Sequence, residues 1–339
     1  MCRAAIPVFP VYSDEIAGRQ FGILKRLVYG NLCRILELGF KVMNTGVQFV
    51  RFVLVALTIT LFTGCMPKKV PPPAVEKPVK VAVVLGAGAA KGFAHIGVLK
   101  VLEGNRVPIN MIVGTSAGSF VGSLYAYGFT AFQLQKISFD LQQAELADYT
   151  IPDKGFIKGE KLEAYINRML RNTPMEKLRI PFYAVATDIQ SGNEVVFGSG
   201  NTGNAVRASC SIPGVFSPAV IGGRMYVDGG LVSPVAVEAA LRQGADVVIA
   251  VDISGDGQGS KPTGTLSTIL QSIGIMYEKI AAHQNQKADV VIKPNVASIG
   301  TSDFTKRHEA VLEGERAAIA ALPAIKAAIA RAKTGNKKL

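Results

Sequence analysis

From Lys80 onward, short apolar runs alternate with amphipathic stretches along the chain. Uninterrupted apolar runs bounded by turn residues indicate buried strands, and an apolar repeat of three to four residues indicates helices. The pattern predicts strands at 80–85, 110–114, 181–188, 194–197, 224–228, 246–252 and 288–293. It predicts helices at 93–104, 117–127, 131–147, 159–171, 234–242, 264–285 and from about 309 onward. This alternation predicts an α/β fold, a three-layer sandwich around a central, mostly parallel sheet.

A separate apolar run, FVLVALTITLF at residues 52–62, precedes this region and is followed by Thr63-Gly64-Cys65. Eleven residues are too few to cross a hydrocarbon core of about 30 Å as a helix, but they suit a secretory signal. The segment Leu61–Cys65 resembles the lipobox of bacterial lipoproteins, with Phe62 where leucine is usual. The resemblance implies cleavage before Cys65 and lipidation of that cysteine. The alternative is a chance cysteine after a hydrophobic helix.

These features divide the chain into five expected segments. Met43 offers a compact start for the signal, so we interpret residues 1–42 as an over-extended N-terminus. A signal peptide at 43–64 would precede a lipidated cysteine and a proline-rich tether at 65–79, which cannot form a helix or a central strand. The main folded domain then covers 80–300, and a C-terminal helix with a basic tail covers 301–339. By resemblance to lipoprotein sorting, Met66 after the cysteine favours the outer membrane.

The net charge of +12 is concentrated outside the main folded domain, in the first 51 residues, beside the tether and at the C-terminus. No basic run interleaved with aromatic residues is present, so the charge favours an anionic membrane surface over a nucleic acid. A solvated basic tail is the alternative. Of the four cysteines only Cys210 lies in the main domain, so no disulfide is expected and Cys210 is interpreted as a buried residue.

Three glycine-rich turns follow predicted strands, at the edge of the sheet where ligands of α/β proteins bind. The first is Gly86-Ala87-Gly88-Ala89-Ala90-Lys91-Gly92. Its backbone N–H groups at the start of a helix could receive either a phosphate or a reaction oxyanion. As a dinucleotide motif the turn fails, because Lys91 stands where the third glycine is required. A P-loop is also excluded, because Gly-Lys is reversed and no Ser or Thr follows.

The second turn, Gly114-Thr115-Ser116-Ala117-Gly118, has the pattern G-x-S-x-G between a strand and a helix. This is the pattern of a nucleophile elbow, in which flanking glycines permit a sharp turn that presents the serine hydroxyl. The alternative interpretation is a serine that merely caps the helix.

The base that would activate Ser116 is less clear from the sequence. Only three histidines exist. His283 and His308 follow Ser116 in the order expected of a base, but neither lies in a glycine-rich turn or at a strand end, and His95 is better explained by packing. The third turn places Asp228 at a strand end before Gly229 and Gly230, and a carboxylate with a raised pKa can act as a general base. Asp188 and Asp252 also end predicted strands, so spacing alone leaves them as alternatives.

The ordered motifs GAGAAKG, GTSAG and DGG resemble those of the patatin-like phospholipase family, and so do ATDIQSG at 186–192 and RASCSIPGVFSP at 207–218. The resemblance covers about residues 80–295. It implies a Ser–Asp dyad of Ser116 and Asp228, an oxyanion hole in the first turn, and no metal or cofactor. The chain departs from the family in having Ala87 and Ala89 for glycines and Lys91 for arginine. The oxyanion residues so implied are Gly86, Ala87, Gly88, Ala89, Lys91 and Gly92.

We therefore expect a membrane-anchored serine acyl hydrolase, of phospholipase A or lysophospholipase type, with membrane lipids as both substrate and surface. A thioesterase would use the same chemistry. A non-catalytic binding or scaffold protein that retains the fold is an alternative of a different class, and a nucleotide-binding protein is a third. No nucleic-acid partner is expected.

Overall fold

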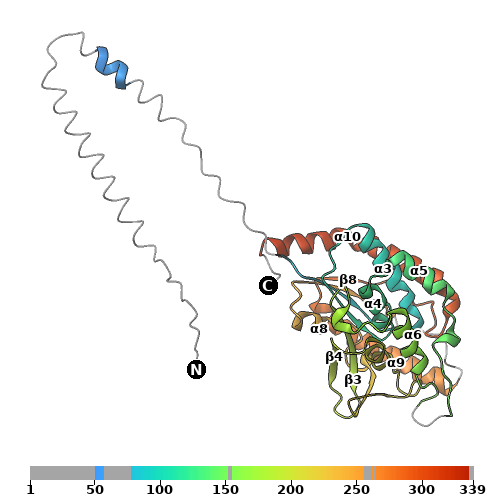
Figure 1. Ribbon diagram of the computed structural model, residues 1–339. Coiled ribbons are helices and arrows are strands. Elements are labelled where there is room, and N and C mark those ends of the chain that lie inside the picture. Colours follow the sequence, from blue (N-terminus) through green and yellow to red (C-terminus); the bar gives the residue numbers. More distant parts are fainter. Residues whose placement is uncertain (1–49, 57–77, 152–154, 256–261, 263, 336–339) are drawn as a thin grey trace, which may run out of the picture. The chain divides into compact units, whose positions relative to one another are not determined.

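The computed structural model describes residues 50–56, 78–151, 155–255, 262 and 264–335 (Figure 1). The chain divides into two compact units, Met1–Ala74 and Val75–Leu339. In the first unit, residues 50–56 are helical and exposed. Among the described residues, no helix has the length and apolar character needed to span a membrane. Cys65, residues 1–42 and most of the expected signal and tether lie outside the described part of the chain, so these expectations remain predictions.

In the described residues the second unit is built on an eight-stranded mixed sheet with the order β5-β6-β3-β2-β1-β7-β8, and β4 pairs with β3. The central strands β3, β2, β1, β7 and β8 run parallel, which confirms the mostly parallel sheet. β4, β5 and β6 add antiparallel pairs at one end. The strands are β1 Val81–Leu85, β2 Met111–Thr115, β3 Phe182–Asp188, β4 Glu194–Phe197, β5 Ala219–Ile221, β6 Arg224–Asp228, β7 Val247–Val251 and β8 Val290–Ile292.

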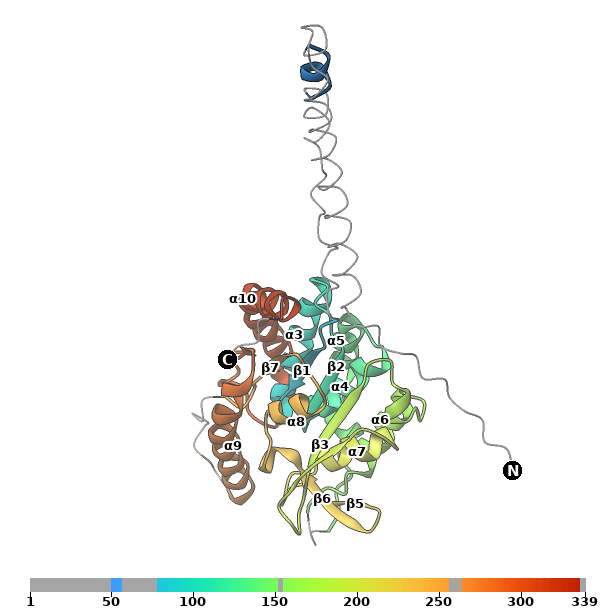
Figure 2. The same cartoon turned by 90° about the vertical axis from the view of Figure 1, so that its left-hand side faces the viewer.

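Helices cover both faces of the sheet, as the predicted three layers require (Figure 2). They are α3 Phe93–Gly104, α4 Ala117–Tyr127, α5 Ala131–Asp140, α6 Glu160–Met169, α7 Thr202–Ser209, α8 Val237–Arg242, α9 Thr265–Gln284 and α10 Arg307–Lys333. Short 3₁₀ turns lie between them, including η1 Ala89–Gly92, η2 Gln143–Glu145 and η4 Gly229–Leu231. Two elements, α7 and β5, have no counterpart among the sequence predictions.

The strand β1 shows how one apolar run supplies two cores. Val81, Val83 and Leu85 pack with α3, α4 and α10 on one face, whereas Ala82 and Val84 pack with α8 on the other. Successive side chains of a strand point to opposite faces, and both faces of β1 are covered by helices, so all five residues are fully buried. A strand buried on both faces therefore reads as a continuous apolar run.

The helices α3 and α10 cross at very short distance and lie side by side in both views (Figures 1 and 2). A Cβ atom on Gly97 would lie 1.9 Å from the carbonyl oxygen of Val311, and one on Gly314 would lie 2.0 Å from that of Ala94. Both positions therefore need glycine, since backbone occupies the space of any side chain. This contact fixes the beginning of α3, which follows directly from the first glycine turn.

The structure corrects one boundary and supplies one strand direction that the sequence left open. The predicted helix 131–147 ends at Asp140, because Leu141 takes an extended conformation and is buried, and the separate turn η2 follows. The strand β6 runs antiparallel to β3 instead of joining the parallel set. A pattern of apolar residues cannot reveal this, because it is the same for both strand directions.

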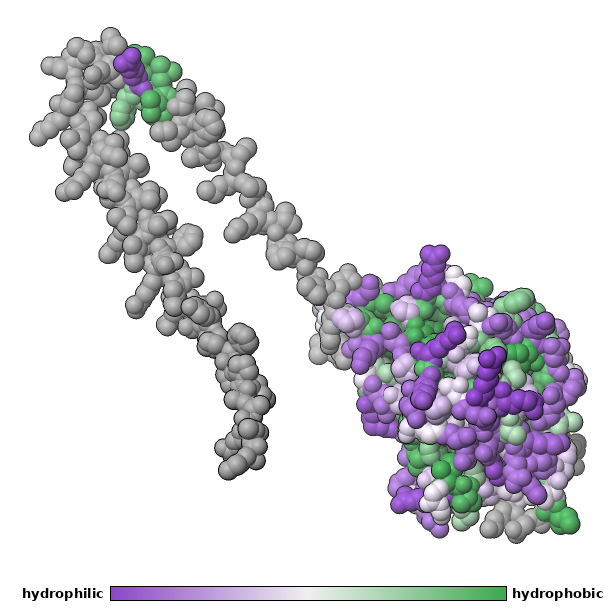
Figure 3. Space-filling model, viewed as in Figure 1, coloured by the Kyte–Doolittle hydropathy of each residue, from purple (hydrophilic) through white to green (hydrophobic). Residues whose placement is uncertain are grey.

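Polar and charged side chains cover most of the face of this unit seen in Figure 3, and apolar side chains form small scattered patches there. The large apolar side chains that are more than two-thirds exposed are Phe132, Tyr149 and Ile151. Isolated apolar residues of this kind are common on protein surfaces.

Candidate active site

Ser116 occupies a strained turn between β2 and α4. Its φ of 53° and ψ of −122° are unusual for a residue with a side chain, and it is only 3% exposed. The flanking glycines allow the turn to pack tightly. A Cβ atom on Gly114 would lie 2.5 Å from Cα of Ser119, and one on Gly118 would lie 1.9 Å from the carbonyl oxygen of Leu85. The local geometry is that of a nucleophile elbow rather than a simple cap, and Ser116 makes no side-chain cap hydrogen bond.

Hydrogen bonds from distant segments hold this turn in place. The N–H of Ser116 donates to Oγ of Ser209 at 2.9 Å, and that hydroxyl donates to the carbonyl oxygen of Val185 at 2.6 Å. The N–H and Oγ of Ser119 both donate to the carbonyl oxygen of Ser116, at 2.8 and 2.7 Å. Ser209, on α7, was not singled out from the sequence. Its only signal there is its place in the stretch 207–218.

Asp228 ends β6, opposite Ala186 of β3, and is fully buried. Its Oδ1 accepts a hydrogen bond from the N–H of Gly230 at 2.7 Å. A Cβ atom on Gly229 would lie 2.2 Å from the carbonyl oxygen of Val185, so glycine is required where the turn passes over β3. Asp228 pairs with Ala186, and the preceding residue Val185 pairs with Thr115 of β2, so Asp228 lies within one residue of the level of Thr115 in the sheet.

The environment of Asp228 makes its carboxyl a weak acid. Burial raises its pKa from 3.8 to about 6, opposed by the Ser116 hydroxyl, the Gly230 N–H and the Tyr277 hydroxyl. The Ser116 and Tyr277 hydroxyls are near enough to lower this pKa, although neither meets the geometry of a full hydrogen bond to Oδ2. A carboxylate of this kind is ionised at neutral pH and can accept a proton.

The first glycine turn lies beside Ser116. A Cβ atom on Gly92, the last residue of the turn, would lie only 2.6 Å from Cβ of Ala117, the residue after Ser116. Most of its N–H groups are already used within the fold. The N–H groups of Gly86, Ala87, Ala90 and Lys91 donate to the carbonyl oxygens of Val251, Pro234, Thr301 and Gly88, respectively. The N–H groups that donate to no acceptor among the described residues are those of Gly88 and Ala89, which precede the first hydrogen bonds of η1.

This finding narrows the oxyanion residues implied by the family resemblance. Gly86, Ala87 and Lys91 cannot donate to a ligand without losing a backbone hydrogen bond, and the N–H of Gly92 lies inside η1. The left-handed residue of the turn is Ala89, with a φ of 50°, rather than Gly88, whose φ of 169° is ordinary. Gly88 is needed because a Cβ atom there would lie 2.7 Å from Cδ1 of Ile253.

The other two strand-end aspartates have structural roles. Oδ1 of Asp188 accepts from the N–H groups of Gln190 and Ser191, both at 3.0 Å, and these hydrogen bonds lower its pKa. Oδ1 of Asp252 accepts from the N–H and the hydroxyl of Ser254, and its Oδ2 accepts from Asn285 at 2.8 Å. Both carboxylates cap turns and are committed to partners there.

The histidines also lie away from the position of a base. His283 and His308 are exposed, and His308 stacks on Phe139. His95 is fully buried, and its Nε2 lies 2.8 Å from the carbonyl oxygen of Gly86, so Nε2 must carry the proton. Burial lowers the pKa of His95 to about 4, which keeps the ring neutral at physiological pH. His95 therefore supports the first glycine turn from behind.

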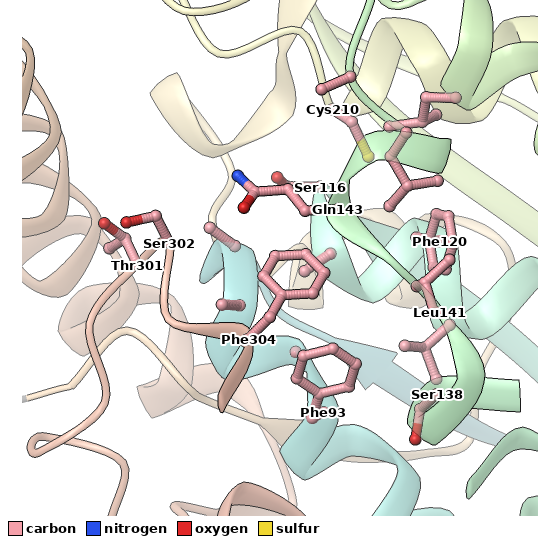
Figure 4. Close-up of a pocket in the computed structure, with 18 of the residues that line it drawn as sticks. Phe93, Ser116, Phe120, Ser138, Leu141, Gln143, Cys210, Thr301, Ser302 and Phe304 are labelled. Carbon is pink, nitrogen blue, oxygen red and sulfur yellow. The ribbon is translucent and has the colours of Figure 1, made fainter. Parts of the chain in front are cut away.

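An apolar cavity of about 220 Å³ includes Ser116 in its wall. Figure 4 shows Phe93 and Phe304 close together on one side of Ser116 and Cys210 on the other, with Phe120 standing apart from both, near Leu141. The remaining walls come mainly from α3, α4, α5 and the segment 141–147. Burial raises the pKa of the Cys210 thiol, so it is a packing residue and a poor nucleophile. The cavity has the chemistry of a site for a hydrocarbon chain.

No group of three or more His, Cys, Asp or Glu side chains suited to a metal ion occurs among the residues that the structure describes. The absence of a metal or cofactor from the reaction stays a prediction.

Comparison with known proteins agrees with this geometry. Residues 83–241 match the family model of the patatin-like phospholipases. An uncharacterized NTE family protein of Mycobacterium tuberculosis is 33% identical over 213 residues, which are 60% of this chain and 59% of that protein. Patatin-like phospholipase domain-containing protein 6 of Homo sapiens is 32% identical over 230 residues, which are 65% of this chain and 16% of that protein. The chain thus spans less than two thirds of the length of these relatives.

Among solved structures, that of VipD from Legionella pneumophila has a TM-score of 0.51 at 12% sequence identity, and the match covers 74% of this chain and 67% of that one. This likeness concerns the fold alone. Ser116 and Asp228 both fall inside the segment that matches the family model. The chain therefore carries a domain of the patatin-like phospholipase family at residues 83–241.

Proposed function

We propose that this chain hydrolyses acyl esters of lipids, with Ser116 as the nucleophile and Asp228 as its base. The observation that carries the proposal is the meeting of three features at one place. Ser116 stands on a strained turn, the buried carboxyl of Asp228 lies near its hydroxyl, and an apolar cavity has Ser116 in its wall. The family supports lipid acyl hydrolysis in general, and the dyad and its oxyanion donors are the finer part of the proposal.

The proposed reaction proceeds in two halves. Asp228 takes the proton of Ser116 as Oγ attacks the ester carbonyl, and the resulting oxyanion accepts hydrogen bonds from the N–H groups of Gly88 and Ala89. Asp228 then returns the proton to the alkoxide leaving group as the acyl-enzyme forms. In the second half water attacks the carbonyl carbon of the acyl-enzyme, and Asp228 accepts the proton of that water. Asp228 then returns the proton to Oγ of Ser116, and the fatty acid leaves. No imidazole is needed, because the raised pKa of Asp228 suits a proton carrier near neutral pH.

A fluorophosphonate probe tests the dyad, because it labels only an activated serine. We expect labelling of the full chain, none with Ser116→Ala, and labelling about 10²–10⁴-fold slower with Asp228→Asn. Asp188→Asn is the matched control, since it also removes a buried strand-end carboxylate and should label at the normal rate. The double variant Ser116→Ala with Asp228→Asn should hydrolyse esters no more slowly than the slower single variant. Equal labelling of the wild type and the Asp228→Asn variant would show that Asp228 is not the base.

A panel of substrates separates the remaining alternatives. Diacyl phospholipids, lysophospholipids and acyl thioesters should be offered to the full chain as micelles or vesicles, and fatty acid release measured. We expect release from the oxygen esters to exceed release from the thioester. A chain that neither reacts with the probe nor releases fatty acid from any substrate would be a non-catalytic protein that retains the fold.

We also propose that Cys65 carries a lipid and anchors the domain to the outer membrane, where its substrate lies. The support is the sequence pattern at 52–65, which lies mostly outside the described residues. Mass spectrometry of membrane-extracted protein should find a lipid-modified peptide that begins at Cys65 and none from residues 1–64. The Cys65→Ser variant should leave the membrane fraction or retain its signal. An unmodified Cys65 in the mature chain would contradict the anchor.

A further inference from the structure

The hydroxyl of Tyr277 is a buried polar group without a hydrogen bond of normal geometry among the described residues. Tyr277 lies on α9, far in sequence from all three glycine turns, and is 5% exposed. A buried hydroxyl without a partner is costly, so its position calls for an explanation. Oδ2 of Asp228 is likewise a buried oxygen without such a bond among the described residues.

The turn after β6 is shaped to admit this tyrosine. A Cβ atom on Gly230 would lie 2.2 Å from Cζ and 2.5 Å from Oη of Tyr277, so the ring occupies the space that a side chain at 230 would fill. The two glycines after Asp228 therefore have separate functions. Gly229 lets the turn pass over β3, whereas Gly230 lets α9 bring a phenol against the turn that carries Asp228.

The groups that face the Asp228 carboxyl come from four elements. Oδ1 receives the N–H of Gly230, and the hydroxyls of Ser116 and Tyr277 approach the carboxyl from the elbow and from α9. Cys210, after α7, is the remaining titratable neighbour, and its thiol stays protonated because burial raises its pKa. Tyr277 also stays protonated, because burial and the carboxylate of Asp228 raise its pKa well above 10. Tyr277 can therefore act toward Asp228 only as a hydrogen-bond donor.

We propose that Tyr277 is a positioning residue whose hydroxyl donates to Oδ2 of Asp228 and holds the carboxylate oriented toward Ser116. The inference rests on the proposed function of Asp228 as the base, and it adds a third residue to the dyad. A hydrogen bond from a neutral donor to a carboxylate stabilises the ionised form and therefore lowers the pKa of the acid. Tyr277 thus limits the increase in pKa that burial causes, and it keeps Asp228 ionised at the pH where it must accept a proton.

The pH dependence of kcat/KM tests this role. In Tyr277→Phe the ring remains and the donor is lost, so the acid limb of kcat/KM should move upward by about one pH unit. Above that limb the rate should recover at least in part, because the base is still present. Tyr165→Phe is the matched control: Tyr165 is also 5% exposed, and its hydroxyl has no contact with Asp228. Its acid limb should coincide with that of the wild type.

A second measurement does not depend on activity. The Asp228 carboxyl is titrated by infrared or carbon NMR spectroscopy in the full-length Ser116→Ala chain, with and without Tyr277→Phe. The inference predicts a higher titration midpoint when the phenol hydroxyl is absent, and an unchanged or lower midpoint overturns it. If the wild type shows no hydrolysis and no probe labelling, the proposed function fails, while the titration still decides whether Tyr277 acts on Asp228. If the wild type is active but the acid limbs coincide, only the inference about Tyr277 is wrong.

Discussion

The turn that carries Ser116 and the turn that carries Asp228 are held by different means. Ser116 has a positive φ, and Gly114 and Gly118 let its turn pack against backbone. Asp228 has an ordinary φ of −48°, and what distinguishes it is full burial, the N–H of Gly230 and two nearby hydroxyls. The proposed nucleophile depends on a strained backbone conformation that presents its oxygen. The proposed base depends on burial and on nearby donors, which together set its pKa.

The backbone side of this comparison is tested most severely by Gly118→Ala. The new Cβ atom would lie 1.9 Å from the carbonyl oxygen of Leu85, the buried last residue of β1, which is paired with β2 on one side and β7 on the other. We expect the free energy of unfolding to fall by more than about 3 kcal/mol, measured by urea denaturation. Gly274→Ala is the control, because nothing lies within 4 Å of its Cβ position on α9. It should leave stability unchanged or raise it by up to about 1 kcal/mol.

Gly88→Val tests the neighbouring glycine turn in the same way. Its Cβ would lie 2.7 Å from Cδ1 and 3.1 Å from the carbonyl oxygen of the fully buried Ile253, and the branched side chain needs still more room, so we expect the turn to shift and displace its two unpaired N–H groups. We expect kcat and kcat/KM to fall together by about 10²–10³-fold, with slow probe labelling retained, because the lost contacts belong to the transition state. Calorimetry with ATP, NAD and NADP supplies the counter-test. Micromolar binding of any of them to the wild type would assign the turn to a nucleotide.

The effect of burial on Asp228 is tested by comparing the thermal stability of Asp228→Asn with that of the wild type. The pKa of Asp228 in the folded chain, about 6, lies above its ordinary value of 3.8, so the folded state binds the extra proton between these pH values. Wild-type stability should therefore fall as pH rises from about 4 to 6, by up to about 3 kcal/mol. Asparagine cannot ionise, so the variant should melt higher than the wild type at pH 7.5 while its activity is lost.

The matched variant Asp188→Asn should behave in the opposite sense. Hydrogen bonds from Ser191 and Gln190 lower the pKa of Asp188, so its carboxylate stabilises the fold above its ordinary pKa and this contribution is lost as pH falls. The variant should melt lower than the wild type at pH 7.5. Thermal melts of both variants at pH 4 and 7.5 check the pair. A lower melting temperature for Asp228→Asn at pH 7.5 would contradict the strained environment proposed for the base.

The smallest effects are expected from the histidines, which lie outside both turns. His283→Ala and His308→Ala should keep kcat/KM within about two-fold of the wild type, because both side chains are exposed. His95→Ala should lower kcat/KM more, by about ten-fold, because it removes the donor to the carbonyl oxygen of Gly86 behind the first glycine turn. Each rate is corrected for the folded fraction measured by circular dichroism. Complete loss of activity in His283→Ala or His308→Ala would restore the idea of a histidine base.

Local patterns determined much of this protein from the sequence alone. The apolar runs predicted the parallel strands, since a strand buried on both faces must be apolar throughout. The elbow at Ser116 was also predictable from the sequence, because its strained residue and its glycines all lie within one turn. The family resemblance then singled out Asp228, although spacing had left Asp188 and Asp252 open.

Only the tertiary structure decided the features that depend on distant segments. Asp188 and Asp252 cap turns because their partners fold back onto them, and the three aspartates look alike in the sequence. The free N–H groups of the first turn could be identified only once the acceptors of its other N–H groups were known, and Val251, Pro234 and Thr301 among these come from distant segments. Ser209 and Tyr277 reach the site from α7 and α9, and β6 reaches it by running antiparallel. A sequence pattern records the neighbours of a residue along the chain, whereas the burial and hydrogen bonds that set a pKa come from neighbours in space.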